Sequence, residues 1–373
     1  MLLKLIKLLL VSKKTFRLPK KNRLIILDET GSNKIADHIL GHNDFTIMHP
    51  KNNILNVPIL VYSLFFLFKY KKDIYEVCFI KYVGAKFALT WIDNAYNYCN
   101  ILSFIPSCKL GLIQNGRIED LRFKNFSKNR LKCDYYFVNG SNAQSFFEKN
   151  LDANYVVMGS AIANNFELSS HDSVKKIQWI SQFRDHNKDH PFHKNYEIGT
   201  QFAMGVIKKF CESKKIKLEI ISFTGSSQEE QSYDKLIGDY DYTFLKSDVD
   251  LHPYDSYSAL SSDGIIVGMD SQLLYEAFGL KYRTAFLCFL ATYMNDNNRR
   301  FAWEESKDDM GAFWSNVPNE KQIFNVLDYL INVNINQWFL QVEKFDGLMK
   351  HDPGNLIIRK ILNTEGVKLK LLN

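Results

Sequence analysis

The chain has 373 residues, of which 46% are hydrophobic and 14% aromatic. That length fits two domains of ordinary size, and the composition is too apolar for a disordered protein. The net charge is +6, yet residues 1–23 carry eight Lys or Arg and no acid, which leaves 39 basic and 41 acidic residues elsewhere. Proteins that bind nucleic acid keep their basic surplus on the folded body, so this class is excluded.

The N-terminal segment, residues 1–22, has the pattern of a basic amphipathic helix. In a helical conformation, one side of the segment is apolar, with Leu2, Leu5, Ile6, Leu9 and Leu10. Another side is basic, with Lys4, Lys7 and Lys14. The apolar run is too short to span a bilayer, and no signal-peptide cleavage site follows it. A helix packed on the protein itself is the alternative. We predict attachment to an anionic membrane surface.

The cysteines indicate the cellular compartment in which the protein works. The six cysteines form no C-x-x-C pair and lie mostly in apolar segments, as reduced and buried thiols of a cytosolic protein do. We therefore expect a cytoplasmic protein, peripheral on the inner face of the cytoplasmic membrane. A second apolar run, residues 57–68, is also too short to cross a membrane and is expected to form a buried helix.

Short β-rich segments alternate with helical stretches, which predicts parallel sheets of the α/β class. In the first half, strands are predicted at 23–28, 45–49, 87–93, 109–114, 134–140 and 155–160. After a polar stretch, further strands are predicted at 177–183, 217–223, 242–247, 263–269 and 284–289. We predict two Rossmann-like lobes, 23–170 and 171–373, with a crevice between them and a helical C-terminus.

The second lobe contains a pattern suited to a nucleotide. Asp270 or Ser271 follows the strand 263–269 at the expected N-cap of a helix, where backbone N–H groups and the helix dipole favour a phosphate. Glu276 lies in the second helical turn, in position to accept hydrogen bonds from ribose hydroxyls. His252 and the backbone at Pro253 are placed to donate to the same phosphate. The alternative is a well-capped packing helix with a surface glutamate.

Arg184 follows the first strand of the second lobe, in "SQFRD". Ligands of doubly wound sheets bind beyond the carboxyl ends of the strands, so an arginine there can neutralise a donor phosphate. A surface arginine at a strand end is the equally simple alternative.

The first lobe offers carboxylates at strand ends. Asp93 ends the strand 87–93 and is the first candidate for the catalytic carboxylate, with Asn94 beside it. Glu29, together with Asp28, lies in the first strand–helix loop and is the second candidate. A polar residue between strand and helix is also a common helix cap, which is the alternative for each acid. A further loop provides candidates for binding the sugar acid or the acceptor, namely Asn115 and Arg117.

Other motifs carry less weight. His186, His190 and His193 lie in a polar loop without a second cluster, so we predict no metal site. "FTGSSQ" (223–228) has a glycine after a strand but lacks both G-x-G-x-x-G and the Walker lysine, which speaks against a dehydrogenase or ATPase. The aromatic block 301–316 either stacks on a ligand or packs internally, and we favour packing.

Several of these motifs resemble those of GT-B glycosyltransferases. Glu276-Ala277-Phe278-Gly279 on a serine-capped helix is similar to the E-A-x-x-x-G pattern of their donor lobe, with the glycine earlier than usual. His252-Pro253, with Ser261-Ser262 downstream, resembles motifs of bacterial sialyltransferases and Kdo transferases. One difference is Gln272, which stands at a position where these families more usually have a Thr-Leu sequence. This resemblance implies a CMP-activated sugar whose phosphate contacts the histidine.

The resemblance extends along the chain. "TWIDNAYNY", "LIQNGRIED", "WISQFRD", "RRFAWEE" and "MGAFWSNVP" are similar, in order, to segments of surface-carbohydrate biosynthesis proteins over about residues 23–335. It implies a metal-independent transferase acting in capsule, O-antigen or lipopolysaccharide biosynthesis. The substrate would be a Kdo-like or nonulosonic acid, moved to a glycan or lipid-linked acceptor without a cofactor. A UDP-sugar transferase or 2-epimerase-like enzyme, and a non-catalytic bilobal assembly protein, are the alternatives.

Overall fold

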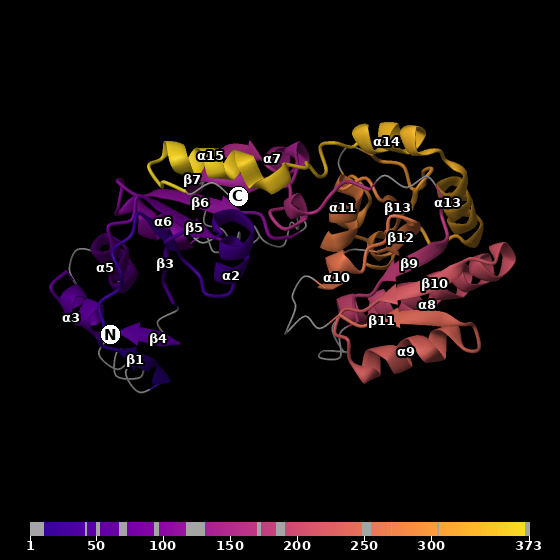
Figure 1. The fold of residues 1–373 in the computed structure, drawn as a ribbon, viewed down its shortest axis with the longest axis horizontal. Coiled ribbons are helices and arrows are strands. Elements are labelled where there is room, and N and C mark those ends of the chain that lie inside the picture. Colours follow the sequence, from indigo (N-terminus) through magenta and orange to yellow (C-terminus); the bar gives the residue numbers. More distant parts are fainter. Residues whose placement is uncertain are drawn as a thin grey trace. The chain divides into compact units, whose positions relative to one another are not determined.

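The computed structural model describes residues 11–41, 43–49, 53–66, 73–92, 97–116, 131–169, 173–183, 191–247, 255–269, 271–303 and 306–369. The chain folds into two compact units. The first comprises Met1–Phe166 and Lys350–Asn373, and the second comprises Glu167–Met349. Each unit contains a six-stranded parallel sheet with helices packed against it (Figure 1), so the α/β class with two Rossmann-like lobes is confirmed.

The sheet of the first unit has the strand order β3-β2-β5-β6-β7-β8. Its strands are β2 (Leu24–Ile26), β3 (Thr46–Ile47), β5 (Phe87–Thr90), β6 (Lys109–Ile113), β7 (Leu131–Val138) and β8 (Leu151–Val157). The flanking helices are α2 (Ser32–Ile35), the π-helix η1 (Ala36–Leu40), α5 (Ile74–Val83), α6 (Asn97–Ser103), α7 (Ser141–Phe147) and η4 (Ala163–Asn165). The chain runs outward from β2 in one direction to β3 and in the other to β5. The topological switch point therefore lies between β2 and β5.

The sheet of the second unit has the order β11-β10-β9-β12-β13-β14, with its switch point between β9 and β12. Its strands are β9 (Lys176–Ile180), β10 (Lys217–Ile221), β11 (Tyr242–Leu245), β12 (Gly264–Gly268), β13 (Arg283–Leu287) and β14 (Trp314–Ser315). Its helices are α8 (Pro191–Lys214), α9 (Ser227–Ile237), α10 (Asp255–Ser258), α11 (Gln272–Gly279), α12 (Leu290–Tyr293), η5 (Asn297–Arg299), α13 (Glu320–Asn332) and α14 (Ile335–Glu343).

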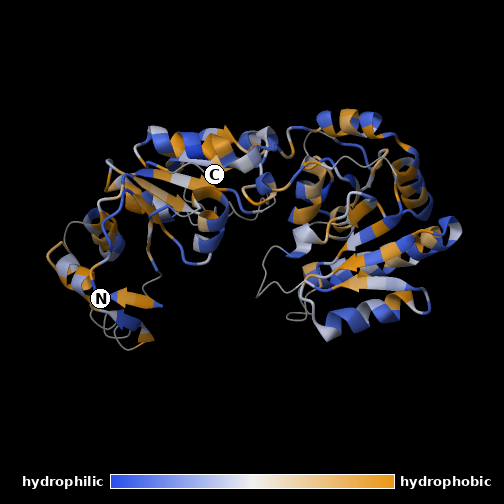
Figure 2. Cartoon of the chain, in the orientation of Figure 1, coloured by the Kyte–Doolittle hydropathy of each residue, from blue (hydrophilic) through white to orange (hydrophobic). Residues whose placement is uncertain are grey.

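The central strands of both sheets are apolar because helices cover them, and they appear as hydrophobic in Figure 2. In the second unit, Phe278, Phe286, Phe301 and Phe313 pack together with ring centroids 4.6–6.5 Å apart. Trp314 stacks on Phe301 and is nearly buried. The packing interpretation of the aromatic block is thereby confirmed for its buried members.

Part of the N-terminal segment 1–22, for which an amphipathic helix was expected, forms a strand of the first unit. Residues 1–10 lie outside the described part of the chain, but β1 (Lys13–Thr15) pairs in parallel with β4 (Ile54–Asn56). The backbone N–H of Lys13 also donates to the carbonyl of Asn53 at 2.9 Å. The segment that follows residue 10 is therefore integral to the first unit, because its backbone hydrogen bonds are made there.

The apolar run 57–68 was expected to be a buried helix, and this is wrong for its first part. α3 (Val57–Leu64) buries only Ile59, Leu60 and Ser63. Val61, Tyr62, Leu64 and the following Phe65 are exposed. Among the residues that the structure covers, no helix is both long and apolar enough to cross a bilayer.

The C-terminal residues 350–373 were expected in the second lobe but belong to the first unit. A buried amide network holds them there. Asn355 donates to the carbonyls of His38 (2.9 Å) and Ala161 (2.8 Å) and accepts a hydrogen bond from Asn164 (2.8 Å). The side-chain Oδ1 of Asn164 accepts from the backbone N–H of Asp352 at 2.8 Å. Specific buried hydrogen bonds of this kind are invisible to sequence periodicity.

The returning chain ends in two short helices. The 3₁₀ turn η6 (Pro353–Asn355) leads directly into α15 (Leu356–Thr364), and Asn355 adopts a left-handed conformation with φ 55° between them. Asparagine tolerates this region better than most residues, because its short polar side chain bonds locally. One residue thus sets both the turn and the attachment of α15.

We predict that Asn355→Ala destabilises the first unit. The substitution leaves the buried carbonyls of His38 and Ala161 without this donor, and we expect the free energy of unfolding to fall by about 2–4 kcal/mol in urea titrations followed by circular dichroism. Leu356→Ala, at a neighbouring side chain that is 64% exposed, is the matched control. It should change stability by less than about 0.5 kcal/mol. Equal stability of both variants would contradict the role of the network.

Candidate functional site at the sheet switch points

In the second unit, the residue predicted to start the phosphate-binding helix lies at the switch point. Ser271 is the N-cap of α11, directly beyond β12, and it is nearly buried. Its hydroxyl makes no capping hydrogen bond to the helix. The first N–H groups of α11 are thus not satisfied by the cap side chain, which suits an anion drawn by the helix dipole.

Glu276 is buried rather than displayed on the surface. Only 3% of it is exposed, and its carboxylate accepts a hydrogen bond from the Tyr257 hydroxyl. The Gln272 side-chain amide lies 3.4 Å from its other oxygen. The surface-glutamate alternative is therefore wrong. Burying a carboxylate is unfavourable unless its oxygens are bonded, so its position next to the α11 N-terminus is held by specific contacts.

Sequence reasoning missed Tyr257 and Gln178. Tyr257 lies on α10, five positions after His252, and fixes one oxygen of Glu276. Gln178, fully buried in β9, donates to the carbonyl of Ala259 (2.9 Å) and accepts from the N–H of Ser261 (2.7 Å). A glutamine inside an apolar strand was the available signal, because buried amides are almost always hydrogen-bonded.

His252, Pro253 and Arg184 lie outside the described residues. Ser247, after β11, has its hydroxyl 3.2 Å from that of Ser256, and its N–H donates to the Ser222 hydroxyl at 2.8 Å. Ser247 is thereby joined both to the end of β10 and to α10.

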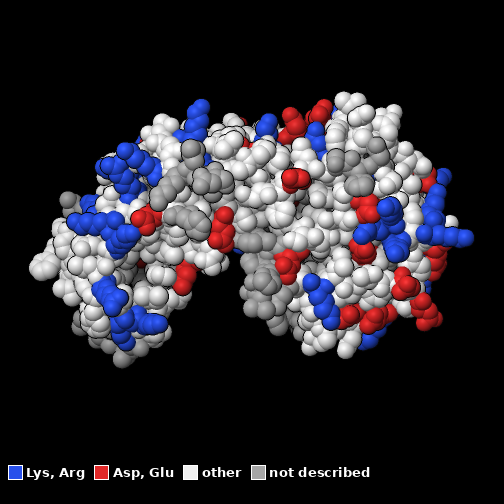
Figure 3. All heavy atoms as spheres, viewed as in Figure 1, with Lys and Arg blue, Asp and Glu red and all other residues white. Residues whose placement is uncertain are grey.

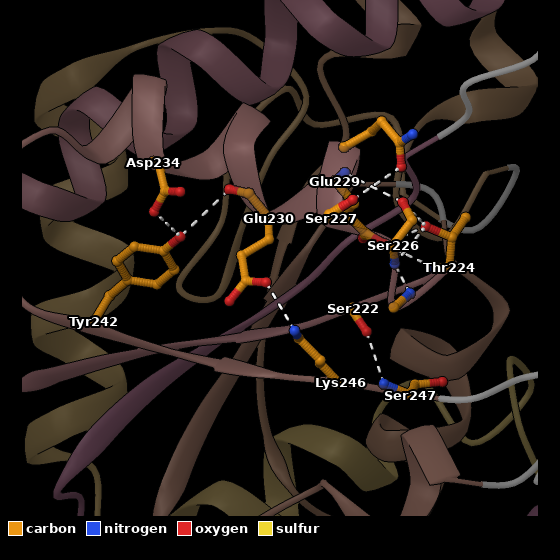
Figure 4. Close-up of polar contacts among 12 residues, drawn as sticks. Ser222, Thr224, Ser226, Ser227, Glu229, Glu230, Asp234, Tyr242, Lys246 and Ser247 are labelled. Atoms are coloured by element: carbon orange, nitrogen blue, oxygen red, sulfur yellow. Dashed lines mark hydrogen bonds and ion pairs between the residues drawn. The ribbon is translucent and has the colours of Figure 1, made fainter.

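The glycine-containing loop after β10 cannot offer its N–H groups to a phosphate, because a glutamate already occupies them (Figure 4). Glu229 is fully buried, and its carboxylate accepts from the N–H groups of Phe223 (2.8 Å), Thr224 (2.7 Å) and Gly225 (3.2 Å). Ser226 caps α9 by accepting from the N–H of Glu229 at 3.2 Å. The Glu229 carboxylate and the Ser226 cap are therefore structural. They leave the α11 terminus as the better phosphate position.

In the first unit, Asp28 is a structural residue and not a catalytic candidate. It is buried at the switch point, where its carboxylate accepts from the N–H of Gly31, the Thr90 hydroxyl (2.8 Å) and the N–H of Trp91 (3.0 Å). It thereby joins the ends of β2 and β5. The donors come from both loops that meet at this edge, so the Asp28 carboxylate has a structural role there.

Glu29 differs from its neighbour, because it is half-exposed at the same edge. Its carboxylate lies 3.2 Å from the Nδ1 of His49, a residue that sequence reasoning did not single out. Hydrogen bonding from His49, with a smaller contribution from Asn53, lowers the pKa of the Glu29 carboxyl despite the opposing effect of desolvation. Glu29 is therefore ionised at neutral pH and in place to orient an imidazole.

The remaining first-lobe candidates are only partly covered. Asp93, Asn94 and Arg117 lie outside the described residues. Asn115 is exposed just beyond β6, next to Gln114, whose side chain accepts from the N–H of Asn139 at 2.9 Å. Within the described ranges, no three His, Cys, Asp or Glu side chains are close enough to hold a metal, and the six cysteines are free thiols in buried positions.

The family of the chain follows from a comparison with family models. A model described as "putative O-antigen biosynthesis protein" matches residues 112–366, which is more than half of the sequence. The chain belongs to this O-antigen biosynthesis family. No curated protein is similar enough in sequence to count as a match.

Solved structures of the GT-B type share the two-lobed α/β fold of this chain. The UDP-GlcNAc 2-epimerase from Neisseria meningitidis bound to UDP-GlcNAc has a TM-score of 0.55 at 11% identity, covering 91% of this chain and 99% of that one. The co-structure of S. aureus MnaA with UDP has 0.52 at 12%, covering 95% and 98%. The wall teichoic acid polymerase TagF has 0.51 at 10%, covering 93% and 89%. At these identities the likeness establishes the fold alone.

We predict that Glu229→Gln weakens the second unit, because an amide cannot accept from all the loop N–H groups that the carboxylate binds. The free energy of unfolding should fall by about 1–3 kcal/mol in urea titrations. Glu230→Gln is the matched control, since Glu230 pairs with exposed Lys246 at 2.9 Å and the loss of a surface pair is worth about 0.5 kcal/mol. If the two variants are equally stable, Glu229 does not hold the loop.

Proposed function

We propose that this protein is a glycosyltransferase of surface-polysaccharide biosynthesis that uses a nucleotide-activated sugar. The observation that carries the proposal is the arrangement at α11, where an N-terminus not capped by its serine side chain adjoins a buried, positioned glutamate at a sheet switch point. Switch points of parallel sheets bind ligands beyond the strand ends. Membership of the O-antigen family supports the role in surface-carbohydrate assembly.

For the donor, we propose a CMP-activated Kdo-like or nonulosonic acid. The support is the resemblance of His252-Pro253 and Ser261-Ser262 to motifs of CMP-sugar transferases. In this proposal the phosphate lies at Ser271, with His252, Pro253 and Arg184 as further contacts, and Glu276 receives the ribose hydroxyls. A UDP-sugar is the second candidate, because two solved proteins of the same fold are described with UDP or UDP-GlcNAc bound.

For the chemistry, we propose that the first unit supplies the base and the acceptor contacts. Asp93, or Glu29 in its place, takes the proton of an acceptor hydroxyl, whose oxygen then bonds to the anomeric carbon of the donor. The bond from that carbon to the phosphate oxygen breaks, and the nucleotide leaves with the electron pair. The α11 terminus and His252 stabilise the negative charge of the leaving phosphate. Asn94, Asn115 and Arg117 bind the sugar acid or acceptor. No cofactor enters this scheme.

We also propose that the enzyme works as a peripheral protein on the inner face of the cytoplasmic membrane, on a glycan or lipid-linked acceptor. The support is the basic, acid-free N-terminal sequence together with reduced, buried cysteines.

The donor pocket is tested by nucleotide affinity. We expect CMP to raise the melting temperature more than UDP, GDP or NAD does, and His252→Ala and Glu276→Gln to raise its dissociation constant about tenfold, the loss of one polar contact. Glu230→Gln is the control, because Glu230 on α9 pairs with exposed Lys246 and its loss should leave the dissociation constant unchanged. Selective stabilisation by UDP would favour the second donor. If no nucleotide raises the melting temperature, or if both variants bind with unchanged affinity, the proposed nucleotide site at α11 is wrong.

The catalytic carboxylate is tested by turnover. We predict that Asp93→Asn keeps nucleotide affinity while turnover falls about 100-fold or more, the scale of losing a general base. Asp28→Asn should instead destabilise the protein, since Asp28 holds the strand ends together. Near-normal turnover of the Asp93 variant would transfer the role to Glu29, and a loss of folding would identify Asp93 as a helix cap.

A further inference from the structure

The exposed apolar side chains of the protein are concentrated in one place. Of the 13 large hydrophobic residues that are exposed in the described part of the chain, seven lie in the two segments 11–18 and 61–65. Phe65 is 79% exposed and Phe16 is 74% exposed. Single exposed apolar residues are ordinary, but a cluster of this size on one unit marks a surface that contacts something other than water.

Helix α3 supplies half of this surface. It contains no charged residue and is apolar on both sides, yet only Ile59, Leu60 and Ser63 face the protein. Val61, Tyr62 and Phe65 follow one another at helical spacing on the opposite side and are exposed. A helix that is hydrophobic all round is normally enclosed on every side. The outer side of α3 is therefore built for an apolar environment.

Asn56 holds the N-terminal segment against this helix. It is buried, its side chain caps α3 by accepting from the N–H of Ile59 (3.1 Å), and it donates to the carbonyl of Arg17 (2.7 Å). Its N–H donates to the Tyr75 hydroxyl at 2.9 Å. The residues around Arg17 are thereby fixed beside the start of α3, as the adjoining β1 and β4 show in Figure 1. The two exposed segments are therefore neighbours on the first unit, joined through Asn56.

This surface is basic at its edge. Lys13, Lys14 and Arg17 are exposed, and no acidic residue occurs before Asp28. Basic side chains gather over the end of the first unit that carries β1 in Figure 3. A second copy of the chain is a less suitable partner, because a two-fold interface pairs each patch with itself and would place two basic edges against each other. An anionic lipid surface satisfies both the apolar centre and the basic edge.

We infer that α3 and residues 11–18 form a membrane-docking face, on which the outer side of α3 lies in the headgroup region of an anionic bilayer. This inference rests on the proposal that the protein acts at a membrane, and it replaces attachment through the N-terminal tail alone. Asn53 connects the face to the proposed acceptor side, since its carbonyl accepts from Lys13 (2.9 Å) and its amide lies 3.5 Å from the Glu29 carboxylate. When this face is bound to the bilayer, the distance of Glu29 from the lipid surface is therefore fixed.

The test is co-sedimentation of the full-length protein with phosphatidylglycerol-containing vesicles, without donor or acceptor, so that its result does not depend on glycosyl transfer. We expect Val61→Asp/Phe65→Asp to reduce binding at least tenfold, since two side chains that enter the lipid become charged. Leu356→Asp is the matched control, an equally apolar and exposed residue on α15, and should bind as the wild type does. Lys13→Glu/Lys14→Glu should also reduce binding, and phosphatidylcholine vesicles should bind the wild type weakly.

Three results would overturn the inference. The wild type could fail to bind anionic vesicles, or Val61→Asp/Phe65→Asp could bind as the wild type does while deletion of residues 1–10 abolishes binding. The face could instead prove to be a subunit interface, with Val61→Asp/Phe65→Asp converting a dimer to a monomer in sedimentation velocity and leaving vesicle binding unchanged. Thermal melting confirms that the variants are folded, and Phe65→Ser repeats the test with an uncharged substitution.

Discussion

The constraint on which this protein depends is that parallel strands need a crossover after each strand, so all loops that follow strands gather at one edge. In both sheets the strand order reverses once, between β2 and β5 and between β9 and β12. At those two points the loops diverge to opposite sides and leave room beyond the strand ends. Asp28, which joins the ends of β2 and β5, lies at one switch point, and Ser271, the N-cap of α11, lies at the other.

Buried carboxylates at these edges have different partners, and the partners distinguish structural from functional roles. Asp28 and Glu229 are bound mainly by backbone N–H groups of loops at the sheet edges, so they fix those loops in shape. Glu276 is bound by side chains, the Tyr257 hydroxyl and the Gln272 amide, next to a helix start that its own serine does not cap. Side-chain partners can rearrange when a ligand arrives at lower energetic cost than backbone partners can. That difference supports Glu276 as the ligand-binding member.

The first unit is completed by parts far apart in sequence. The C-terminal α15 is bound through Asn355 and Asn164, and β1 is bound through β4 and Asn56. Because Asn56 also caps α3, the N-terminal segment and the exposed apolar helix share one fixed orientation relative to the sheet. A surface attachment made through this region would therefore position the whole first unit and not merely tether it.

The sequence by itself determined the α/β class and the two series of strands, because fully buried parallel strands read as continuous apolar runs. It also determined that a helix would start at Asp270 or Ser271 beyond a central strand, since small polar residues between strand and helix are typical N-caps. Tertiary structure decided which carboxylates are bound by hydrogen-bond donors of nearby loops. It also decided that residues 350–373 return to the first unit and that the apolar helix α3 has one exposed side. Those outcomes depend on hydrogen bonds and packing between distant residues, such as Asn355 with His38, and periodicity along the chain contains no information on such pairings.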